Sequence, residues 1–266
     1  MKSKILGAII VIVVFLPFLI IGELPFALFM SVLSAIGLHE LLKVRESRKE
    51  FPLILKLIAY LLVIAFCMYN TSSIDFQYNF NYRVMSMLIF IFLSPMVFIN
   101  DSKKYNLNDA LFLIGTILFI GLSFNLIIII RNQDINYIIY LLLITTITDT
   151  FALFTGLLVG EHKLSPIISP KKTIEGLIGG VIMGTFAASA FYTTVINPNA
   201  SLLLIGSITL ILSLVGQLGD LVFSSIKRYY GVKDFADLIP GHGGILDRFD
   251  SLIFVTLAFI IIINYL

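Results

Sequence analysis

Long runs of hydrophobic residues alternate with short polar segments along almost the whole chain. An α-helix rises ~1.5 Å per residue and the hydrocarbon core of a membrane is ~30 Å thick, so a run of about 20 apolar residues predicts a membrane-spanning helix. The nine runs of this kind cover residues 5–22, 25–42, 52–69, 83–99, 109–130, 136–158, 174–196, 202–224 and 245–264. The first two are joined so closely, at Glu23-Leu24-Pro25, that they could form one re-entrant pair, which leaves eight spans as the alternative.

Composition agrees with this pattern. Hydrophobic residues make up 59% of the chain and charged residues 13%, and the mean hydropathy is +1.03. These values exclude a water-soluble protein and predict an all-α integral membrane protein, a polytopic helical bundle. The basic residues are spread over short loops and the net charge is only +2, so nothing indicates nucleic-acid binding. The single cysteine, Cys67, excludes an intramolecular disulfide.

The positions of lysine and arginine predict the orientation, because short loops rich in these residues stay in the cytoplasm. With nine spans, sixteen of the 18 basic residues fall on one side, and only Arg83 and Arg131 fall on the other. The side predicted to be cytoplasmic carries the N-terminus and the loops at 43–51, 100–108, 159–173 and 225–244. We therefore expect a multi-pass protein of the cytoplasmic (inner) membrane whose basic loops meet cytosolic ligands.

Polar residues are unevenly distributed between the spans. The first five spans are almost entirely apolar, whereas Asp149, Glu175, Asp220 and Asp247 lie in the last four or at their ends. This contrast predicts a transmembrane scaffold of about five helices at 1–134 and a catalytic transmembrane region at 135–266. The richest stretch of charged residues and glycines lies at 224–250.

The eighth span has one polar face. Steps of three and four residues place a set of side chains on that face, namely Ser213, Gln217, Asp220, Ser224 and either Lys227 or Arg228. A carboxylate inside the membrane costs roughly 2.5–3.5 kcal/mol on insertion scales, so Asp220 requires a partner or water in the bundle interior. A hydrogen bond that only joins two helices is the alternative role. We expect Lys227 to reach the membrane surface and to contribute charge with little packing.

The ninth span begins after a glycine-rich turn that contains His242, Gly243 and Gly244. Glycines let a ligand approach the backbone, and a helix N-terminus offers unpaired amides to an anion, so the turn predicts a phosphate seat. Asp247 and Asp250 share one face of the helix that follows. Favourable interaction with the helix dipole explains Asp250 better than Asp247.

Asp220 and Asp247 lie four residues before and three residues after the loop that connects two antiparallel spans. Both are therefore expected at a similar depth near the cytoplasmic face. Two carboxylates beside a phosphate-bearing ligand would repel it unless cations lie between them, and hard oxygen ligands select Mg²⁺. We predict Mg²⁺ bound by Asp220 and Asp247, with the presence of a second cation left open.

The loop at 161–175 adds further candidates. Lys171 and Lys172 could bind phosphate, or could merely follow the positive-inside rule. Thr173 suits the N-cap of the seventh span, and Gly176, Gly180 and Gly184 behind it indicate close helix packing. Asp149 on the sixth span is another intramembrane carboxylate, which could contact either a ligand sugar or a neighbouring lysine.

These residues resemble the signature of the phosphatidate cytidylyltransferase family, also called CDP-diacylglycerol synthase. The matching positions are Ser224, Ile226, Lys227, Arg228, Lys233, Asp234, Ala236, Ile239, Pro240, His242, Gly243, Gly244, Ile245, Asp247, Arg248, Phe249 and Asp250. The likeness extends over roughly residues 145–264. Leu153, Leu157 and Ile174 depart from the family, which usually has an aromatic residue, a basic residue and Trp at these positions.

The resemblance implies that CTP and phosphatidate, the latter within the bilayer, give CDP-diacylglycerol and pyrophosphate with Mg²⁺. On this basis we assign catalysis to Asp220, Asp247, Lys227 and Arg228. Substrate binding is assigned to Ser224, Lys233, His242, Gly243, Gly244, Arg248, Lys171, Lys172 and Asp149. The alternatives are a lipid or polyprenol kinase that uses CTP, and a transporter of an anionic substrate. The oligomeric state stays open, a homodimer included.

Overall fold

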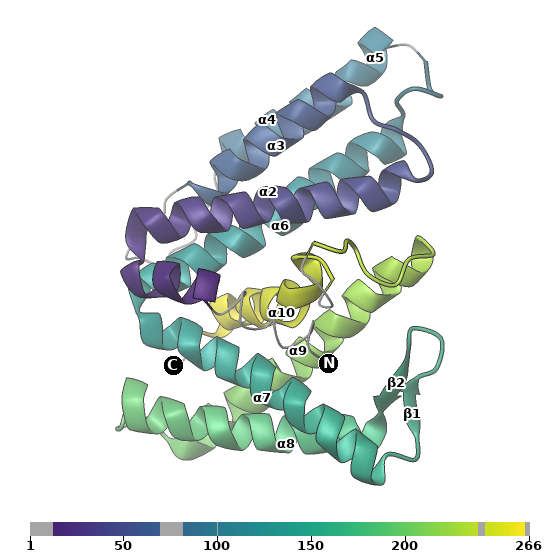
Figure 1. Cartoon of the computed structure of the whole chain (residues 1–266). Coiled ribbons are helices and arrows are strands. Elements are labelled where there is room, and N and C mark those ends of the chain that lie inside the picture. The colour runs from purple at the N-terminus through teal and green to yellow at the C-terminus, as the bar shows by residue number, and fades with distance from the viewer. Residues whose placement is uncertain (1–12, 70–81, 100, 239–242, 264–266) are drawn as a thin grey trace. The chain divides into compact units, whose positions relative to one another are not determined.

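The computed structural model describes residues 13–69, 82–99, 101–238 and 243–263 (Figure 1). Within these ranges the chain is helical except for connecting loops and one short β-hairpin. It divides into two compact units, one formed by residues 14–129 and the other by residues 130–266 together with the segment that ends at Val13. The functional boundary predicted at residue 134 stays a prediction.

The unit at 14–129 consists of packed apolar helices. After a helix at 13–21, its elements are α2 (Glu23–Glu46), α3 (Leu53–Cys67), α4 (Tyr82–Leu93), α5 (Pro95–Ile99) and most of α6 (Leu107–Gln133). Asp109 of α6 is buried and accepts hydrogen bonds from Arg45 and Lys49 near the end of α2. Burying a carboxylate is costly unless it is paired. The two bonds offset this cost and join the end of α2 to α6.

The predicted span at 83–99 is not one continuous helix. It is interrupted at Ser94, and Pro95 begins the separate helix α5. The residue before a proline is disfavoured in the α region, whereas proline itself suits the first position of a helix. Pro95 is visible in the sequence, but a prediction based on hydropathy alone does not take it into account.

The unit at 130–266 contains the polar spans. Its elements are α7 (Ile135–Val159), β1 (Lys163–Ser165), β2 (Ser169–Thr173), α8 (Ile174–Phe191), a π-helix (Tyr192–Ile196), α9 (Leu202–Tyr229) and α10 (Leu246–Ile262). The strands β1 and β2 pair antiparallel, with Lys163 opposite Thr173. This hairpin was not predicted, since residues 159–173 had been expected to form only a loop.

Helices α7 and α8 pack closely through the predicted glycine ladder. A Cβ atom at Gly176 would lie 2.6 Å from the carbonyl oxygen of Ala152, and one at Gly180 would lie 2.5 Å from that of Thr148. Both distances are too short for a methyl group, so a side chain at either position would push the helices apart. The ladder therefore sets the distance between α7 and α8, as the sequence predicted.

Helix α9 is joined to α7 by pairs of buried hydroxyl groups. Tyr140 Oη lies 2.7 Å from Thr209 Oγ1, and Thr148 Oγ1 lies 2.7 Å from Ser213 Oγ. On another side, α9 contacts α10 at Gly219, where an added Cβ would lie 2.9 Å from the carbonyl oxygen of Asp250. Asp220 directly follows Gly219 in the sequence, so this close approach brings Asp250 beside Asp220.

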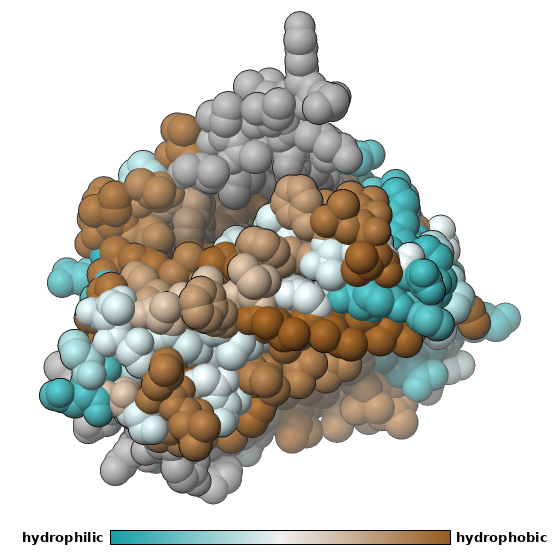
Figure 2. Space-filling view, turned by 90° about the horizontal axis from the view of Figure 1, so that it is seen from below, coloured by the Kyte–Doolittle hydropathy of each residue, from teal (hydrophilic) through white to brown (hydrophobic). Residues whose placement is uncertain are grey.

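Five described helices, α2, α6, α7, α8 with its π-helical end, and α9, are long and apolar enough to cross a membrane by length and composition. The protein is thus a polytopic helical membrane protein, and the count of nine spans stays a prediction. Figure 2 shows hydrophobic side chains over most of one face, with hydrophilic groups gathered toward its edges. This distribution suits a lipid-facing surface bounded by polar ends.

Candidate functional site

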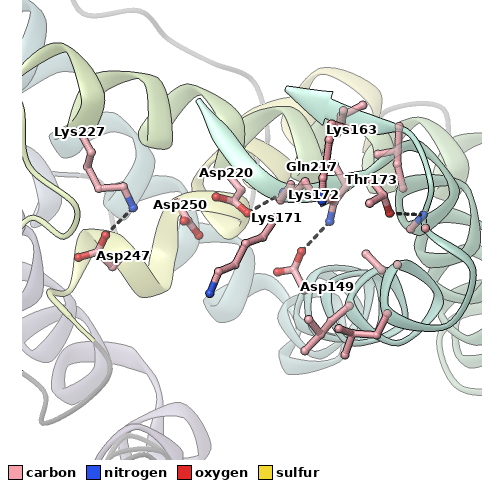
Figure 3. A pocket seen from close by; sticks show the side chains of 18 of the residues that line it. Asp149, Lys163, Lys171, Lys172, Thr173, Gln217, Asp220, Lys227, Asp247 and Asp250 are labelled. Atoms are coloured by element: carbon pink, nitrogen blue, oxygen red, sulfur yellow. Dashed lines mark hydrogen bonds and ion pairs between the residues drawn. The ribbon is translucent and has the colours of Figure 1, made fainter. Parts of the chain in front are cut away.

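A cavity of about 740 Å³ lies among α7, the hairpin, α8, α9 and α10, entirely within the unit at 130–266 (Figure 3). Ligand-binding pockets commonly have volumes of this order. The charged residues that line it are Asp149, Asp220, Asp234, Asp247 and Asp250 together with Lys163, Lys171, Lys172, Lys227 and Arg248. Most of the predicted site residues therefore meet in one place.

One chain of polar contacts crosses the cavity. Gln217 Nε2 of α9 donates a hydrogen bond to Asp149 Oδ1 of α7 at 2.6 Å, and Gln217 Oε1 accepts one from Lys172 Nζ of β2 at 2.9 Å. Lys172 Nζ also lies 2.6 Å from Asp220 Oδ2. The partner of Asp149, which the sequence left open, is thus Gln217. One glutamine and one lysine link two carboxylates from different helices.

Asp247 is held by a second set of contacts at the start of α10. Lys227 Nζ lies 2.7 Å from Asp247 Oδ1, while the amides of Phe235 and Gly244 donate to Asp247 Oδ2 at 3.0 and 2.9 Å. Gly243 has φ of 78° and permits this turn, since an added Cβ would lie 2.8 Å from Asp247 Oδ2. Asp247 therefore holds the backbone at Phe235 and at Gly244.

These contacts correct two expectations, one about Lys227 and one about the glycine-rich turn. Lys227 is buried against Asp247 and does not reach the surface, because its ammonium group neutralises the buried carboxylate. The Gly244 amide, expected to face a phosphate, instead donates to the Asp247 side chain in this structure. Of the two basic candidates on α9, Lys227 lies on the polar face of the helix and lines the cavity.

Asp220 on α9 and Asp250 on α10 lie next to each other, whereas Asp247 lies earlier in α10, at its start, beside Lys227 (Figure 3). Asp250 Oδ1 accepts a hydrogen bond from the Ser251 amide at 2.7 Å, and in the described part of the chain Asp250 forms no ion pair. Sequence spacing had favoured Asp247 as the partner of Asp220. The packing at Gly219 brings Asp250 to Asp220 as well.

The hairpin carries lysines to the cavity and is fixed at its base. Thr173 caps α8 by accepting a hydrogen bond from the Gly176 amide at 3.1 Å, as predicted. Glu175 accepts one from His162 Nδ1 at 2.6 Å and also accepts from the amides of Glu161 and His162. The start of α8 thereby holds the start of the hairpin.

The carboxylates have the chemistry that Mg²⁺ requires, but they are not assembled around one point. Among the residues described, no three His, Cys, Asp or Glu side chains form a group that could hold a metal ion. Asp220 and Asp247 are each neutralised by a lysine. The donor set thus fits a hard cation in type, and ammonium groups stand beside the carboxylates predicted to bind it.

Comparisons with known proteins identify the family of this chain. A model of the cytidylyltransferase family matches residues 2–266. The chain belongs to the cytidylyltransferase family. Phosphatidate cytidylyltransferases of Staphylococcus haemolyticus (strain JCSC1435) and Staphylococcus aureus (strain COL) are each 40% identical to it over 257 residues, which are 96% of this chain and 96% of each relative. That of Staphylococcus saprophyticus is 38% identical over 256 residues with the same coverage.

Some residues assigned from the cytidylyltransferase signature lie outside the cavity lining. Ser224 donates to Asp220 Oδ1 at 3.2 Å, and Arg228 contacts backbone carbonyls. The other described residues outside the lining are Lys233, Gly243 and Gly244. His242 lies outside the described residues. Arg248, which was assigned to substrate binding, lines the cavity.

Sequence reasoning gave no role to Gln217 and a lesser one to Asp250. Both were placed on polar helix faces, and that periodicity was the available signal. Two departures from the family pattern, Leu153 and Leu157, also line the cavity. They give its α7 wall an apolar character.

Proposed function

We propose that the protein is a phosphatidate cytidylyltransferase, an enzyme that converts CTP and phosphatidate to CDP-diacylglycerol and pyrophosphate. A phosphate oxygen of phosphatidate attacks the α-phosphorus of CTP. The new phosphorus–oxygen bond forms while the bond to the β-phosphate breaks, and pyrophosphate leaves with the bonding electron pair. Family membership and the names of the relatives support this reaction.

The observation that carries the proposal is the mixed lining of the cavity. Five basic side chains lie on it together with apolar ones from α7, β1 and α8, namely Ala152, Leu153, Leu157, Leu164 and Leu177. A substrate that joins a phosphate group to hydrocarbon chains matches both kinds of surface.

Two of the basic residues are available for substrate phosphates. Lys163 and Lys171 line the cavity, and their side chains have no hydrogen-bond or ion-pair partner within the described ranges; Lys171 extends into the open space (Figure 3). Lys172 and Lys227 are already paired with carboxylates. We assign to Lys163, Lys171 and Arg248 the binding of the triphosphate and of the lipid phosphate. Their positive charges would stabilise the negative charge that develops on the leaving oxygen of the triphosphate.

Mg²⁺ is the proposed cofactor. Asp220 and Asp247 would hold it, with Asp250 as a further oxygen donor beside Asp220. The cation would neutralise triphosphate charge and stabilise the leaving pyrophosphate. The aspartates supply the negative charge that would attract the cation. In the structure, Lys172 and Lys227 neutralise Asp220 and Asp247.

We further propose that the cavity opens toward the cytosol at the cytoplasmic membrane. The basic residues of the hairpin and of the loop after α9 support this orientation through the positive-inside rule. CTP would reach the cavity from the water and phosphatidate from the bilayer.

The test of the reaction uses purified protein in detergent with phosphatidate and CTP labelled in either the α- or the γ-phosphate. We expect the lipid product to carry the α-label and pyrophosphate to carry the γ-label. Transfer of the γ-label to lipid would indicate a CTP-dependent kinase instead. Absence of both products with folded protein would contradict the proposal.

A further inference from the structure

Arg228 lies at the end of α9 and donates to two backbone carbonyls. Its Nε contacts the carbonyl oxygen of Ile168 at 3.3 Å, and its Nη1 contacts that of Val232 at 3.1 Å. Neighbouring residues on a helix point in different directions, so Lys227 faces the cavity and Arg228 faces the hairpin. The guanidinium group is therefore engaged outside the cavity lining.

Each of the two carbonyls belongs to a segment that builds the cavity. Ile168 lies in the turn between β1 and β2, directly before the strand that carries Lys171 and Lys172. Val232 precedes Asp234, which lines the cavity, and Phe235, whose amide donates to Asp247. One arginine thus connects the hairpin, the end of α9 and the loop that leads to α10.

The hairpin depends on external contacts for a fixed position. Its strands have three and five residues, and a two-stranded hairpin of this size is marginally stable by itself. At the base, Glu175 accepts hydrogen bonds from the amides of Glu161 and His162. At the turn, the Arg228 bond to Ile168 joins the hairpin to α9. Without that bond, the turn itself would lose its link to α9, and β2 would be joined to α9 only through the contacts of Lys172 with Asp220 and Gln217.

We infer that Arg228 is a positioning residue that fastens the hairpin turn to α9 and so keeps Lys171 and Lys172 in the cavity, and that it does not bind substrate phosphate itself. The inference rests on the proposed function for its kinetic consequence. It replaces the assignment of Arg228 to catalysis that the signature had suggested. A charged arginine can hold two carbonyls at once because its donors form a fixed planar fork.

A reversible cross-link can distinguish the link between the hairpin turn and α9 from the positive charge of the Arg228 side chain. In a Cys67→Ala background, Ile168→Cys and Arg228→Cys are combined and joined by a short bis-methanethiosulfonate reagent about as long as an arginine side chain. Before linking, we expect kcat to fall by about 10-fold to 10²-fold, since small misplacements of catalytic groups have effects of this size. Linking should restore most of kcat, and reduction should abolish the gain.

The controls are the two single-cysteine variants treated with the same reagent, which should show no recovery. A cross-linked protein, verified by mass, that is no more active than the unlinked one would overturn the inference, because it would show that the guanidinium itself is needed. Failure of the two cysteines to link would also overturn it, because the hairpin turn would then not lie beside residue 228.

A second measurement needs no activity. In Arg228→Met, trypsin should cut the hairpin at Lys171 and Lys172 several-fold faster than in the unchanged protein. Lys233→Gln is the matched control, because it removes a basic side chain from the adjacent exposed loop, and hairpin cleavage should not change. Equal cleavage in all three proteins would contradict the fastening role. Failure of the proposed reaction is recognised separately, by the labelled-CTP assay on the unchanged protein.

Discussion

At the scale of single residues, two lysine–carboxylate ion pairs lie among the residues that line the cavity. Lys172 neutralises Asp220 and Lys227 neutralises Asp247, so two of the five aspartates that line the cavity are paired with a lysine of the same chain. A carboxylate removed from water is costly unless it is paired and hydrogen-bonded. The pairs therefore allow the helices to bring several aspartates together before any ligand arrives.

Replacement of Asp220 or Asp247 by Asn tests the proposed Mg²⁺ ligands. Each change removes a ligand charge while preserving size, so we expect kcat to fall by about 10²-fold or more, the loss typical of a major electrostatic contribution. Thermal stabilisation of the protein by Mg²⁺ should weaken in parallel. The matched control is Asp237→Asn, an exposed residue outside the cavity lining. Normal turnover of both variants at limiting Mg²⁺ would exclude this pair as the metal site.

Lys227→Ala is expected to destabilise the protein as well as reduce activity. The side chains of Lys227 and Asp247 are only 10% and 3% exposed, and removing one partner of a buried pair typically costs about 3–5 kcal/mol. Adding Asp247→Ala should recover part of the free energy of unfolding, because no charge then stays buried alone. The double-mutant cycle is measured by denaturant unfolding in detergent. Additive losses would show that the two residues do not interact.

At the scale of elements, close helix approaches determine which side chains meet. The α7–α8 contact at Gly180 and the α9–α10 contact at Gly219 leave no room for a Cβ atom. The first keeps α7, which carries Asp149, against the helix that follows the hairpin. The second brings Asp250 beside Asp220. Small residues at these contacts therefore determine where the side chains of the cavity lie.

Gly180→Ala should lower the free energy of unfolding by about 1–3 kcal/mol, the usual effect of overpacking. The added methyl group would meet the carbonyl oxygen of Thr148, and a backbone atom cannot move aside cheaply. Gly206→Ala is the control on α9, since nothing lies within 4 Å of the added Cβ. That change should be neutral or stabilising by up to about 1 kcal/mol through helix propensity. Equal effects of the two changes would mean that α7 and α8 do not pack at the ladder.

At the scale of the whole molecule, the basic residues predict the orientation in the membrane. The hairpin precedes α8, and the loop at 197–201 follows its π-helical end, so one crossing separates them. In the proposed orientation the hairpin is cytosolic and that loop is outside. The cavity then faces the compartment that supplies CTP.

Cysteine labelling tests this topology. A cysteine at Ser165 should react with a membrane-impermeant reagent only after cell lysis, and one at Asn199 should react on intact cells. The native Cys67 is buried and gives a low background. Labelling of the Ser165→Cys protein on intact cells would reverse the orientation and the proposed cytosolic opening.

Much of the molecule was encoded in local patterns of the sequence. Hydropathy predicted a helical membrane protein, and steps of three and four residues placed Gln217, Asp220 and Lys227 on one face of α9. The N-cap at Thr173 and the glycine ladder at Gly180 were equally readable. Such features depend only on the geometry of a single helix or on one contact between neighbouring helices. For this reason the sequence by itself determined the fold class and the family, and it indicated the region of the candidate site.

The pairing of side chains from distant segments was decided only by the tertiary structure. The sequence paired Asp220 with Asp247 across a loop, but packing at Gly219 adds Asp250 beside Asp220. Arg228 and Lys227 have the same charge and adjacent positions, yet only Lys227 faces the cavity, because the hairpin occupies the other side. These outcomes depend on distances between helices and on a hairpin whose short strands give no hydropathy signal, and neither follows from the periodicity of one segment.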